Sequence, residues 1–424
     1  MPIDIFITGI GMVSPAGCST QTTWSSLLTN QKHVRLVQGV DLNGCNIKFA
    51  GQIHDFAPLK DTENLGRLNQ FAVAAAEQAI TSANLNLKCQ PTGNHKNMLV
   101  LFGYSKCDIE YIYSNYSLFP NDTNYVNNST LVYNYTNYCH KNKLTPNYLL
   151  DTPAVHIAHR FNITGGIYSA VAACSTGTHA IIRAAQMIHD SDANIIIAGS
   201  ADTPIHPLWM GAYEQMGVLA EKHPQLGTEW ACRPFDKTRN GFAVGEGAAV
   251  LVLESSESVN KRKCKPIARI AGYAMGHDPA GLTSLNSDGK SLAHVIKLAC
   301  HMANCRPQQI SCIHAHGTAT PSNDLVEVRA IKQALGKLAD QIPIISIKGA
   351  IGHLLGGAGA VETAVAALTC KYLKCPGTTT LINPDPELGE LLLPRDAFDI
   401  VYGPVLKISL GFGGHLAAML IEPA

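Results

Sequence analysis

Residues 168–183 read Tyr-Ser-Ala-Val-Ala-Ala-Cys-Ser-Thr-Gly-Thr-His-Ala-Ile-Ile-Arg, and the rest of the chain is organised around this stretch. Its first small and apolar residues predict a short buried strand, and the residues from Thr178 onward predict a helix. Cys174 lies where the strand passes into the helix. The N-terminus of a helix favours negative charge, so we expect a lowered pKa and a nucleophilic role for this thiol. An isolated cysteine is more often a core residue, so the assignment depends on residues elsewhere in the chain.

The composition excludes several classes of protein. Hydrophobic residues make up 46% of the 424 residues and charged residues 15%, which favours a large folded core over disorder. Lysine plus arginine and aspartate plus glutamate both number 32, so charge gives no reason to expect nucleic acid or a membrane as partner. No apolar run approaches the roughly 18 residues that span a bilayer, and the N-terminus lacks the basic region of a signal peptide. The 13 cysteines are odd in number and irregularly spaced, which indicates free thiols in a reducing cytoplasm.

Strands and helices alternate along the chain, which predicts an α/β protein whose sheets are covered by helices. Residues 245–254, Gly-Glu-Gly-Ala-Ala-Val-Leu-Val-Leu-Glu, resemble residues 413–422, Gly-Gly-His-Leu-Ala-Ala-Met-Leu-Ile-Glu. Each stretch closes one half of the chain, which indicates a duplicated unit with halves at 1–258 and 259–424. The predicted strands include 3–8, 98–102, 194–198, 245–254, 267–273, 311–316, 343–347, 406–410 and 416–422, and the predicted helices include 65–83, 291–303, 322–335 and 357–373.

Two further stretches have ambiguous patterns. Gly9-Ile10-Gly11 follows the first predicted strand, as in a dinucleotide-binding fingerprint, but Ser14 replaces the third glycine and no acidic residue is evidently placed to hold a ribose. We therefore do not expect a nucleotide there. Residues 104–150 hold nine of the 14 tyrosines, which predicts either an elaborated surface loop or a segment that contacts substrate or another subunit.

Three glycine-rich stretches downstream, residues 314–324, 346–362 and 409–414, place candidate site residues after predicted strands. Glycine at this density indicates that the backbone approaches a ligand or another backbone closely. A cysteine with two neutral histidines suits thioester chemistry, because sulfur accepts the acyl group while the imidazoles donate hydrogen bonds to an oxyanion or enolate. The backbone N–H groups of the cysteine and of the last stretch are candidates for an oxyanion hole. The side chains concerned are His316 in the first stretch, Lys348, His353 and Glu362 in the second, and Phe412 in the third.

A metal site is the alternative interpretation of part of this pattern. Cys312, His314 and His316 alternate, so on a strand they would share one face, and thiol plus imidazole can bind zinc. No fourth ligand stands at a suitable spacing, so we expect no metal.

Four motifs in order resemble those of an elongating β-ketoacyl-ACP synthase, and the resemblance covers nearly the whole chain. It implies the thiolase fold, a duplicated five-layer α-β-α-β-α arrangement, which agrees with the internal repeat. The motifs are Ala173-Cys174-Ser175-Thr176-Gly177, His316-Gly317-Thr318-Ala319-Thr320 with Asp324, Lys348 with His353 and Glu362, and Gly411-Phe412-Gly413-Gly414.

The resemblance also implies a role for each matching residue. Cys174 would take the acyl chain from an acyl carrier protein, and His316 and His353 would support decarboxylation of malonyl-ACP and stabilise the resulting enolate. Neither a redox cofactor nor a metal is needed for this chemistry. The expected partners are acyl carrier protein and a second ketosynthase-like subunit, in a homodimer or a heterodimer. Lys348 would support the histidines together with Glu362 and Asp324, and Thr318 and Thr320 would bind the phosphopantetheine arm. Phe412 would gate the pocket and help form the oxyanion hole, and Gly413 would bind substrate.

Two departures from the family pattern leave the biological role open. His415-Leu416 stands where many members have an asparagine, and the tyrosine-rich segment is longer than in compact fatty-acid enzymes. A polyketide or polyene role is therefore weighed against fatty-acid synthesis. The first alternative is a chain-length factor, a catalytically silent partner subunit, but such subunits typically lack the nucleophilic cysteine. The second is an acyltransferase or decarboxylase that performs half of the reaction, against which the complete Cys-His-His set argues.

Overall fold

The computed structural model describes residues 3–85, 87, 97–106 and 152–424. Ten strands form one continuous sheet, in the order β10-β9-β13-β14-β8-β1-β7-β6-β4-β5, and two small two-stranded sheets accompany it. The strands of the large sheet are β1 (Ile5–Val13), β4 (Met98–Gly103), β5 (Ile167–Ala170), β6 (Ile195–Asp202), β7 (Gly247–Ser255), β8 (Ala268–His277), β9 (Cys312–His314), β10 (Ile344–Ile345), β13 (Val405–Gly411) and β14 (His415–Pro423). The small sheets pair β2 (Val34–Leu36) with β3 (Phe49–Gly51), and β11 (Lys374–Cys375) with β12 (Phe398–Asp399).

The helices predicted at 65–83, 291–303, 322–335 and 357–373 are present to within a few residues, whereas the shorter helices at 20–28, 207–215, 256–262 and 348–351 were not predicted. Among those described, none combines the length and apolar character needed to cross a bilayer. They are α1 (Thr20–Leu28), α2 (Arg67–Ser82), α5 (Thr152–Phe161), α6 (Thr176–His189), α7 (Pro207–Gln215), α8 (Ser256–Arg262), α9 (Lys290–Met302), α10 (Pro321–Leu335), α11 (Lys348–Ile351) and α12 (Ala358–Tyr372).

The sheet is built from two halves with the same topology. In the first half β1 pairs antiparallel with β7, β7 antiparallel with β6, and β6, β4 and β5 run parallel. In the second half β8, β14, β13, β9 and β10 repeat this order and these directions. The sequence repeat between residues 245–254 and 413–422 corresponds to β7 and β14, which occupy equivalent places in the two halves. The duplication is confirmed.

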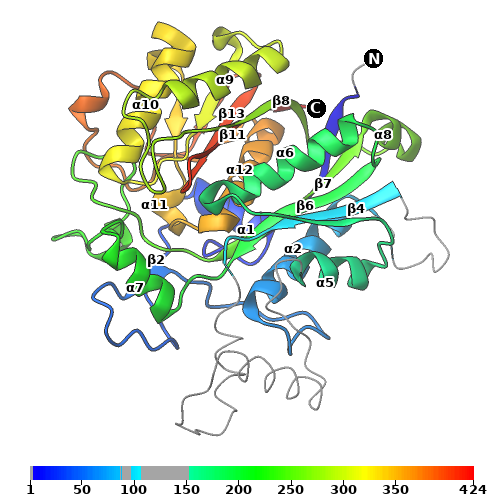
Figure 1. The fold of residues 1–424 in the computed structure, drawn as a ribbon, viewed down its shortest axis with the longest axis horizontal. Helices are drawn as coiled ribbons and strands as arrows, with labels where there is room; N and C mark the ends of the chain where they lie inside the picture. The colour runs from blue at the N-terminus through cyan, green and yellow to red at the C-terminus, as the bar shows by residue number, and fades with distance from the viewer. Residues whose placement is uncertain (1–2, 86, 88–96, 107–151) are drawn as a thin grey trace, which may run out of the picture.

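A short antiparallel pairing between two strands joins the halves into a single sheet. β1 pairs with β8 through Ile5 with Ile270, Phe6 with Arg269 and Ile7 with Ala268. Helices α6 and α12 lie in the middle of the molecule, α2 and α5 cover the outer face of one half-sheet, and α9 and α10 lie on the far side of the other (Figure 1). The expected five-layer thiolase arrangement is therefore confirmed. The boundary expected at residue 258 falls within α8, just before the second half begins at β8.

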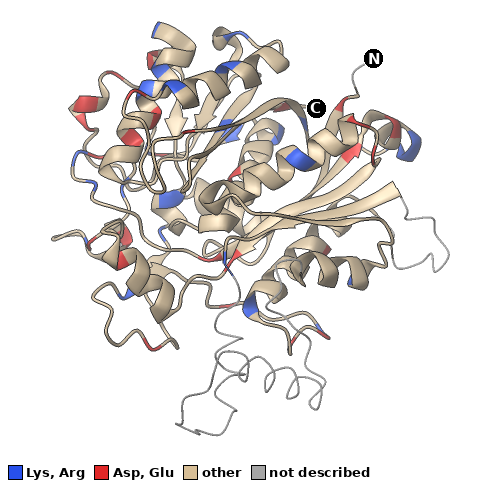
Figure 2. Cartoon of the chain, viewed as in Figure 1, with Lys and Arg blue, Asp and Glu red and all other residues tan. Residues whose placement is uncertain are grey.

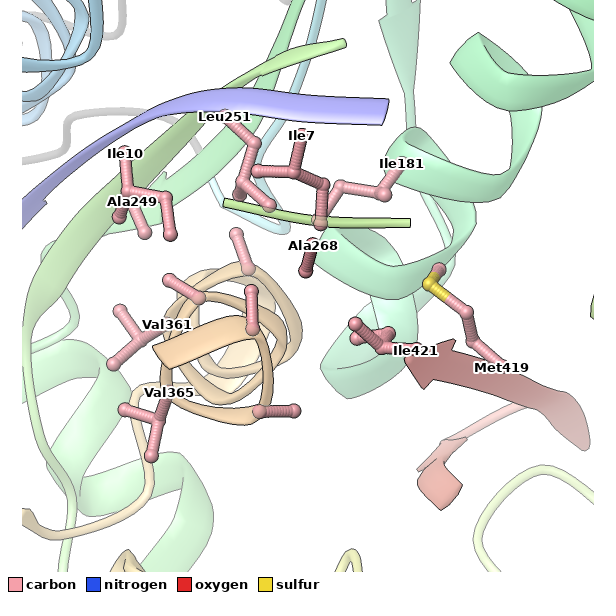
Figure 3. Close-up of a cluster of buried hydrophobic side chains, with 14 of the residues drawn as sticks. Ile7, Ile10, Ile181, Ala249, Leu251, Ala268, Val361, Val365, Met419 and Ile421 are labelled. Carbon is pink, nitrogen blue, oxygen red and sulfur yellow. The ribbon is translucent and has the colours of Figure 1, made fainter. Parts of the chain in front are cut away.

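The middle layer is held by apolar side chains from both halves. Val361 and Val365 of α12 lie among side chains of β1, β7 and β14 (Figure 3). Burial of this kind contributes about 25 cal/mol per Å² of apolar surface. Charged residues of both signs are scattered mainly over the periphery, and the central strands carry few (Figure 2). The charged groups that are buried are therefore exceptional.

Two predictions about local structure were wrong. Residues 9–11 do not follow the first strand but lie within β1, where the glycines allow α2 to pack directly on the strand: a Cβ at Gly11 would overlap the carbonyl oxygen of Ala75. The strand before Cys174 is not buried, because β5 lies at the edge of the sheet and Ile167 and Tyr168 are 39% and 47% exposed. Most of the tyrosine-rich segment 104–150 lies outside the described residues.

The close approach of β1 and α2 generates a stability prediction. Gly11→Ala places a methyl group against the α2 backbone, so we expect a loss of about 1–3 kcal/mol in the free energy of unfolding, measured by denaturant titration. Gly211→Ala in α7 is the matched control, because a Cβ there meets no atom within 4 Å. This control should be neutral or gain up to about 1 kcal/mol from helix propensity. Equal stability of the two variants would contradict the packing role of Gly11.

Candidate functional site

Cys174 lies in a single 3-10 turn, Ala173–Ser175, that leads directly into α6. Ala173 has φ of 47°, a backbone conformation that is uncommon for a residue with a side chain and that occurs often at functional sites. Thr176 holds the turn through its hydroxyl, which donates to the Ala173 carbonyl and accepts from the Ala172 N–H. The side chain of Cys174 is only 8% exposed.

The electrostatic environment of the thiol differs from the expectation. Burial raises the pKa of Cys174 above its usual value, whereas the charges of Lys106 and Lys348 lower it and that of Asp202 raises it further. The N–H of Phe412 donates to the sulfur and favours the thiolate. The prediction of a lowered pKa was wrong because it considered the helix terminus and not the loss of water around the sulfur.

Two histidines face the same pocket as the thiol. The ring centroids of His316 and His353 lie 5.4 Å apart, with the planes nearly perpendicular at 83°. Burial, and next the charge of Lys348, hold the pKa of both imidazoles well below the usual value, so both are neutral near pH 7. The Leu355 N–H donates to Nδ1 of His353, and Lys348 Nζ lies 3.5 Å from Nδ1 of His316. A neutral imidazole that accepts at Nδ1 carries its proton on Nε2. Both rings therefore offer an Nε2–H donor.

A carboxylate between two lysines lies behind His316. The Lys348 ammonium donates to the His316 carbonyl at 2.5 Å and pairs with one oxygen of Glu362. The other oxygen of Glu362 lies 2.9 Å from Nζ of Lys407. All three side chains are at most 4% exposed. Burial lowers the pKa of Lys407, although Glu362 acts in the opposite direction.

Sequence reasoning found Lys348 and Glu362 but missed Lys407. A lysine inside the apolar run of β13 was the available signal, because a charge in a buried strand needs a partner. Lys407 also extends the network towards the nucleophile. Its ammonium donates to Ser409 Oγ at 2.9 Å, and that hydroxyl lies 2.8 Å from the hydroxyl of Thr178 in the first turn of α6.

Two other buried carboxylates shape the loop that carries His316. Glu327 accepts from the N–H groups of His316 at 2.6 Å and Gly317 at 2.8 Å, and burial raises its pKa to about 7. Asp324 accepts from the N–H groups of Phe235 and Ala319. Asp324, expected in the supporting network, holds this loop through these two hydrogen bonds. Glu327 was missed, since a carboxylate within a helix is ordinarily a surface group.

Cys174, His316 and His353 border one pocket with an empty volume of about 640 Å³, which includes space open to solvent. Thr318 and Thr320 lie on its wall with their hydroxyls 2.9 Å apart. Gly413 does not line it and instead forms a turn, with φ of 82°. The pocket brings together the cysteine, both histidines and the Phe412 loop, which are distant in the sequence. Its lining includes Cys174, His316, His353, Thr318, Thr320 and Phe412, with Val218, Phe242 and Leu410 as apolar parts.

A further charged group lies within electrostatic range of the nucleophile. Lys106 Nζ is 3.4 Å from Asp202, and its ammonium lies over the rings of Trp209 and Tyr213. Burial lowers the pKa of Lys106, but Asp202 and Tyr213 outweigh this effect and the pKa is raised. Lys106 is therefore a permanent positive charge that favours the thiolate of Cys174. Nothing in the local sequence pattern identified it.

A second cluster of reactive side chains lies outside the pocket. Within the described part of the chain, Cys312, His314 and Cys375 form a group that could hold a metal ion. Their ligand atoms all lie within 4.8 Å of one another. His316, which was expected to share a face with Cys312 and His314, is not in the cluster, because β9 ends at His314 and the chain then turns into the pocket.

Comparison with known proteins agrees with this geometry. The family model of the β-ketoacyl synthase N-terminal domain matches residues 3–258, and that of the C-terminal domain matches residues 267–381. The chain is 30% identical to 3-oxoacyl-[acyl-carrier-protein] synthase 2 of Coxiella burnetii over 423 residues, covering 99% of this chain and 98% of the relative. It is also 30% identical to the Synechocystis enzyme of the same name over 416 residues, covering 97% and 96%.

Solved structures show the same similarity across the full length of both chains. A ketosynthase bound to a hexaketide, in complex with its type II polyketide acyl carrier protein (AntDE:AntF), is 26% identical with a TM-score of 0.88. A β-ketoacyl synthase from Burkholderia phymatum is 25% identical with a TM-score of 0.85. With matched halves, a duplicated fold and a Cys-His-His pocket, the chain belongs to the β-ketoacyl synthase family and is a ketosynthase, an enzyme of the acyltransferase class.

Proposed function

We propose that the protein condenses an acyl group held on Cys174 with malonyl-ACP, with release of CO2. The observation that carries this proposal is the meeting of one thiol and two Nε2–H donors in a single pocket. A thiolate can accept the acyl group, and paired neutral donors suit the oxygen of an enolate, which they stabilise without protonating it.

The first half-reaction is acyl transfer. The Cys174 sulfur attacks the thioester carbonyl of acyl-ACP, and the carbonyl oxygen becomes an oxyanion that the Phe412 N–H is placed to receive. The carrier thiol then leaves and takes up the proton that Cys174 has lost. Lys106 and Lys348 favour the thiolate that this step needs.

The second half-reaction forms the carbon–carbon bond. Malonyl-ACP loses CO2, and the electron pair left behind forms an enolate whose oxygen accepts hydrogen bonds from His316 and His353. The enolate carbon attacks the acyl-cysteine, the Cys174 thiolate leaves, and the product is a β-ketoacyl-ACP two carbons longer. Atoms and electrons balance with no redox cofactor and no metal at this pocket. Thr318 and Thr320, on the pocket wall, are suited to hold the phosphopantetheine arm.

We infer that the partners are acyl carrier protein and a second ketosynthase-like subunit. Two observations support a partner subunit. Strand β5 pairs with β4 on one side and with none of the other described strands, and Tyr168 and Val171 beside this edge are 47% and 56% exposed. Such an edge favours pairing with another chain. The free state of the described cysteines fits a reducing compartment such as the cytoplasm.

Within this activity we favour a polyketide role over fatty-acid synthesis. The ion pair of Lys106 and Asp202 and the Tyr213 hydroxyl lie near the nucleophile, and such polar surroundings suit an acyl chain that carries oxygen better than a plain alkyl chain. The solved ketosynthase that carries a hexaketide is in line with this choice. The two halves would divide the work, residues 1–258 supplying the nucleophile and Lys106, and residues 259–424 the two histidines with Lys348 and Lys407.

The assignment of the nucleophile predicts a covalent intermediate. Cys174→Ala should keep the fold and lose the mass increase of acyl-enzyme when the protein is incubated with acyl-ACP and examined as intact protein by mass spectrometry. Cys300→Ala, a core cysteine of α9, is the control and should be acylated at the wild-type rate. Full acylation of Cys174→Ala would overturn the assignment.

Lys407 predicts a change in pH dependence. Its positive charge is one of the causes that lower the pKa of His316 and His353. Removing it in Lys407→Met raises both pKa values, so the histidines become protonated at a higher pH. We expect the acidic limb of the kcat/KM profile to move to higher pH. Lys374→Met, at an exposed position of β11, should leave the profile unchanged. An acidic limb that moved down or stayed in place would contradict this role.

The choice of substrate is tested with acyl-ACPs of graded length and oxidation. Purified enzyme is incubated with malonyl-ACP and each acyl-ACP, and the products are read by mass spectrometry. We expect kcat/KM for 3-oxoacyl chains to exceed that for saturated chains of equal length by about tenfold, which corresponds to about 1.4 kcal/mol. A tenfold preference for saturated chains would instead place the enzyme in fatty-acid synthesis, without affecting the condensation itself.

A further inference from the structure

The cluster of Cys312, His314 and Cys375 has no part in the condensation. The two sulfurs lie 3.4 Å apart, and Nε2 of His314 lies 3.6 Å from the sulfur of Cys375. All three side chains are at most 1% exposed. A fourth donor adjoins them, because the hydroxyl of Thr369 is 3.5 Å from Nε2 of His314.

The fold brings these side chains together from three elements. Cys312 and His314 are two residues apart on β9 and therefore point to the same face of the strand. Thr369 lies near the end of α12, and Cys375 lies on β11, which follows that helix. Sequence spacing could not reveal the group, because Cys375 lies about sixty residues from the other two.

The distances suit a metal ion with soft ligands. Zinc binds sulfur at about 2.3 Å and imidazole nitrogen at about 2.0–2.1 Å, so the edges of a tetrahedral site are about 3.5–3.8 Å. The measured separations of 3.4 and 3.6 Å lie close to these edges. Thiolate and imidazole together select Zn²⁺ or Cu⁺ over harder cations.

We propose that Cys312, His314 and Cys375 form a structural metal site for a soft d¹⁰ ion, Zn²⁺ or Cu⁺, with the Thr369 hydroxyl available as a fourth ligand for zinc. This reverses the expectation from sequence that the chain holds no metal. Binding converts two thiols into two metal–thiolate bonds and releases two protons. With Zn²⁺ the net charge of the core is then unchanged, so the nearby Lys407 ammonium presents no net electrostatic obstacle.

The site would fix the position of two catalytic elements relative to each other. The residue His314 is two positions before His316 on the same chain segment, and Thr369 is on the helix that carries Glu362. An ion held between β9 and the end of α12 therefore stabilises the frame in which Lys348 reaches both Glu362 and His316. Its role is structural, because neither sulfur borders the pocket.

Metal content tests the site without reference to activity. Full-length protein is stripped with a chelator under reducing conditions, incubated separately with Zn²⁺ and Cu⁺, desalted, and measured by elemental mass spectrometry. We expect about one ion per chain and a raised thermal midpoint, since a metal that binds only the folded state stabilises it. The ion that yields this stoichiometry identifies the metal. Cd²⁺ should add the ultraviolet charge-transfer absorption of metal–thiolate bonds.

Two variants localise the binding. Cys375→Ser should reduce bound metal to background and abolish the thermal shift. Cys370→Ser is the matched control, because this neighbouring thiol is equally buried but donates to the Ile421 carbonyl and is not among the clustered ligands. It should bind metal as the wild type does. Background metal in wild-type protein, equal metal in wild type and Cys375→Ser, or a protein mass 2 Da lower because Cys312 and Cys375 have formed a disulfide would each overturn the proposal.

Discussion

The structure of the site depends on one buried carboxylate, Glu362, held between two buried ammonium groups. Charges taken out of water are tolerated only where partners compensate them, and removing one partner leaves a charge stranded. Lys348, Glu362 and Lys407 come from three different elements of the C-terminal half, so each element is held in register by the other two. Because Lys348 also donates to the His316 carbonyl, this constraint passes directly to a histidine of the pocket.

The duplicated fold brings the two halves of the site together. Helices α6 and α12 occupy equivalent places, and their first turns meet where Gly177 and Gly359 leave no room for a side chain: a Cβ at either would overlap the other helix. Backbone contact at this point helps to place Cys174, just before α6, in the same pocket as His353, which precedes α12. The chain of hydroxyls from Lys407 through Ser409 to Thr178 crosses the same junction.

Much of the fold and of the site was predictable from the sequence, and there are physical reasons why the rest was not. The order of strands and helices, the duplication and the residues of the Cys-His-His pocket follow from local patterns and motifs. Lys407, Glu327 and Lys106 did not, because a charge becomes informative only when its burial and partners are known. The exposure of β5 depends on its place at the sheet edge, and the pairing of Cys375 with Cys312 depends on the packing of α12. The sequence shows which residue types are present, but the burial and the partners of each side chain are known only from the tertiary structure.

The same surroundings have different effects on the pKa of the cysteine and on the pKa values of the histidines. Burial disfavours whichever form is charged, so it raises the pKa of the thiol and lowers that of an imidazole. Positive charge lowers both. For His316 and His353 the two effects therefore add, and neutrality near pH 7 follows from either. For Cys174 they oppose each other, so the thiolate depends on Lys106, Lys348 and the Phe412 N–H. One set of lysines thus keeps the hydrogen-bond donors neutral and makes the nucleophile available.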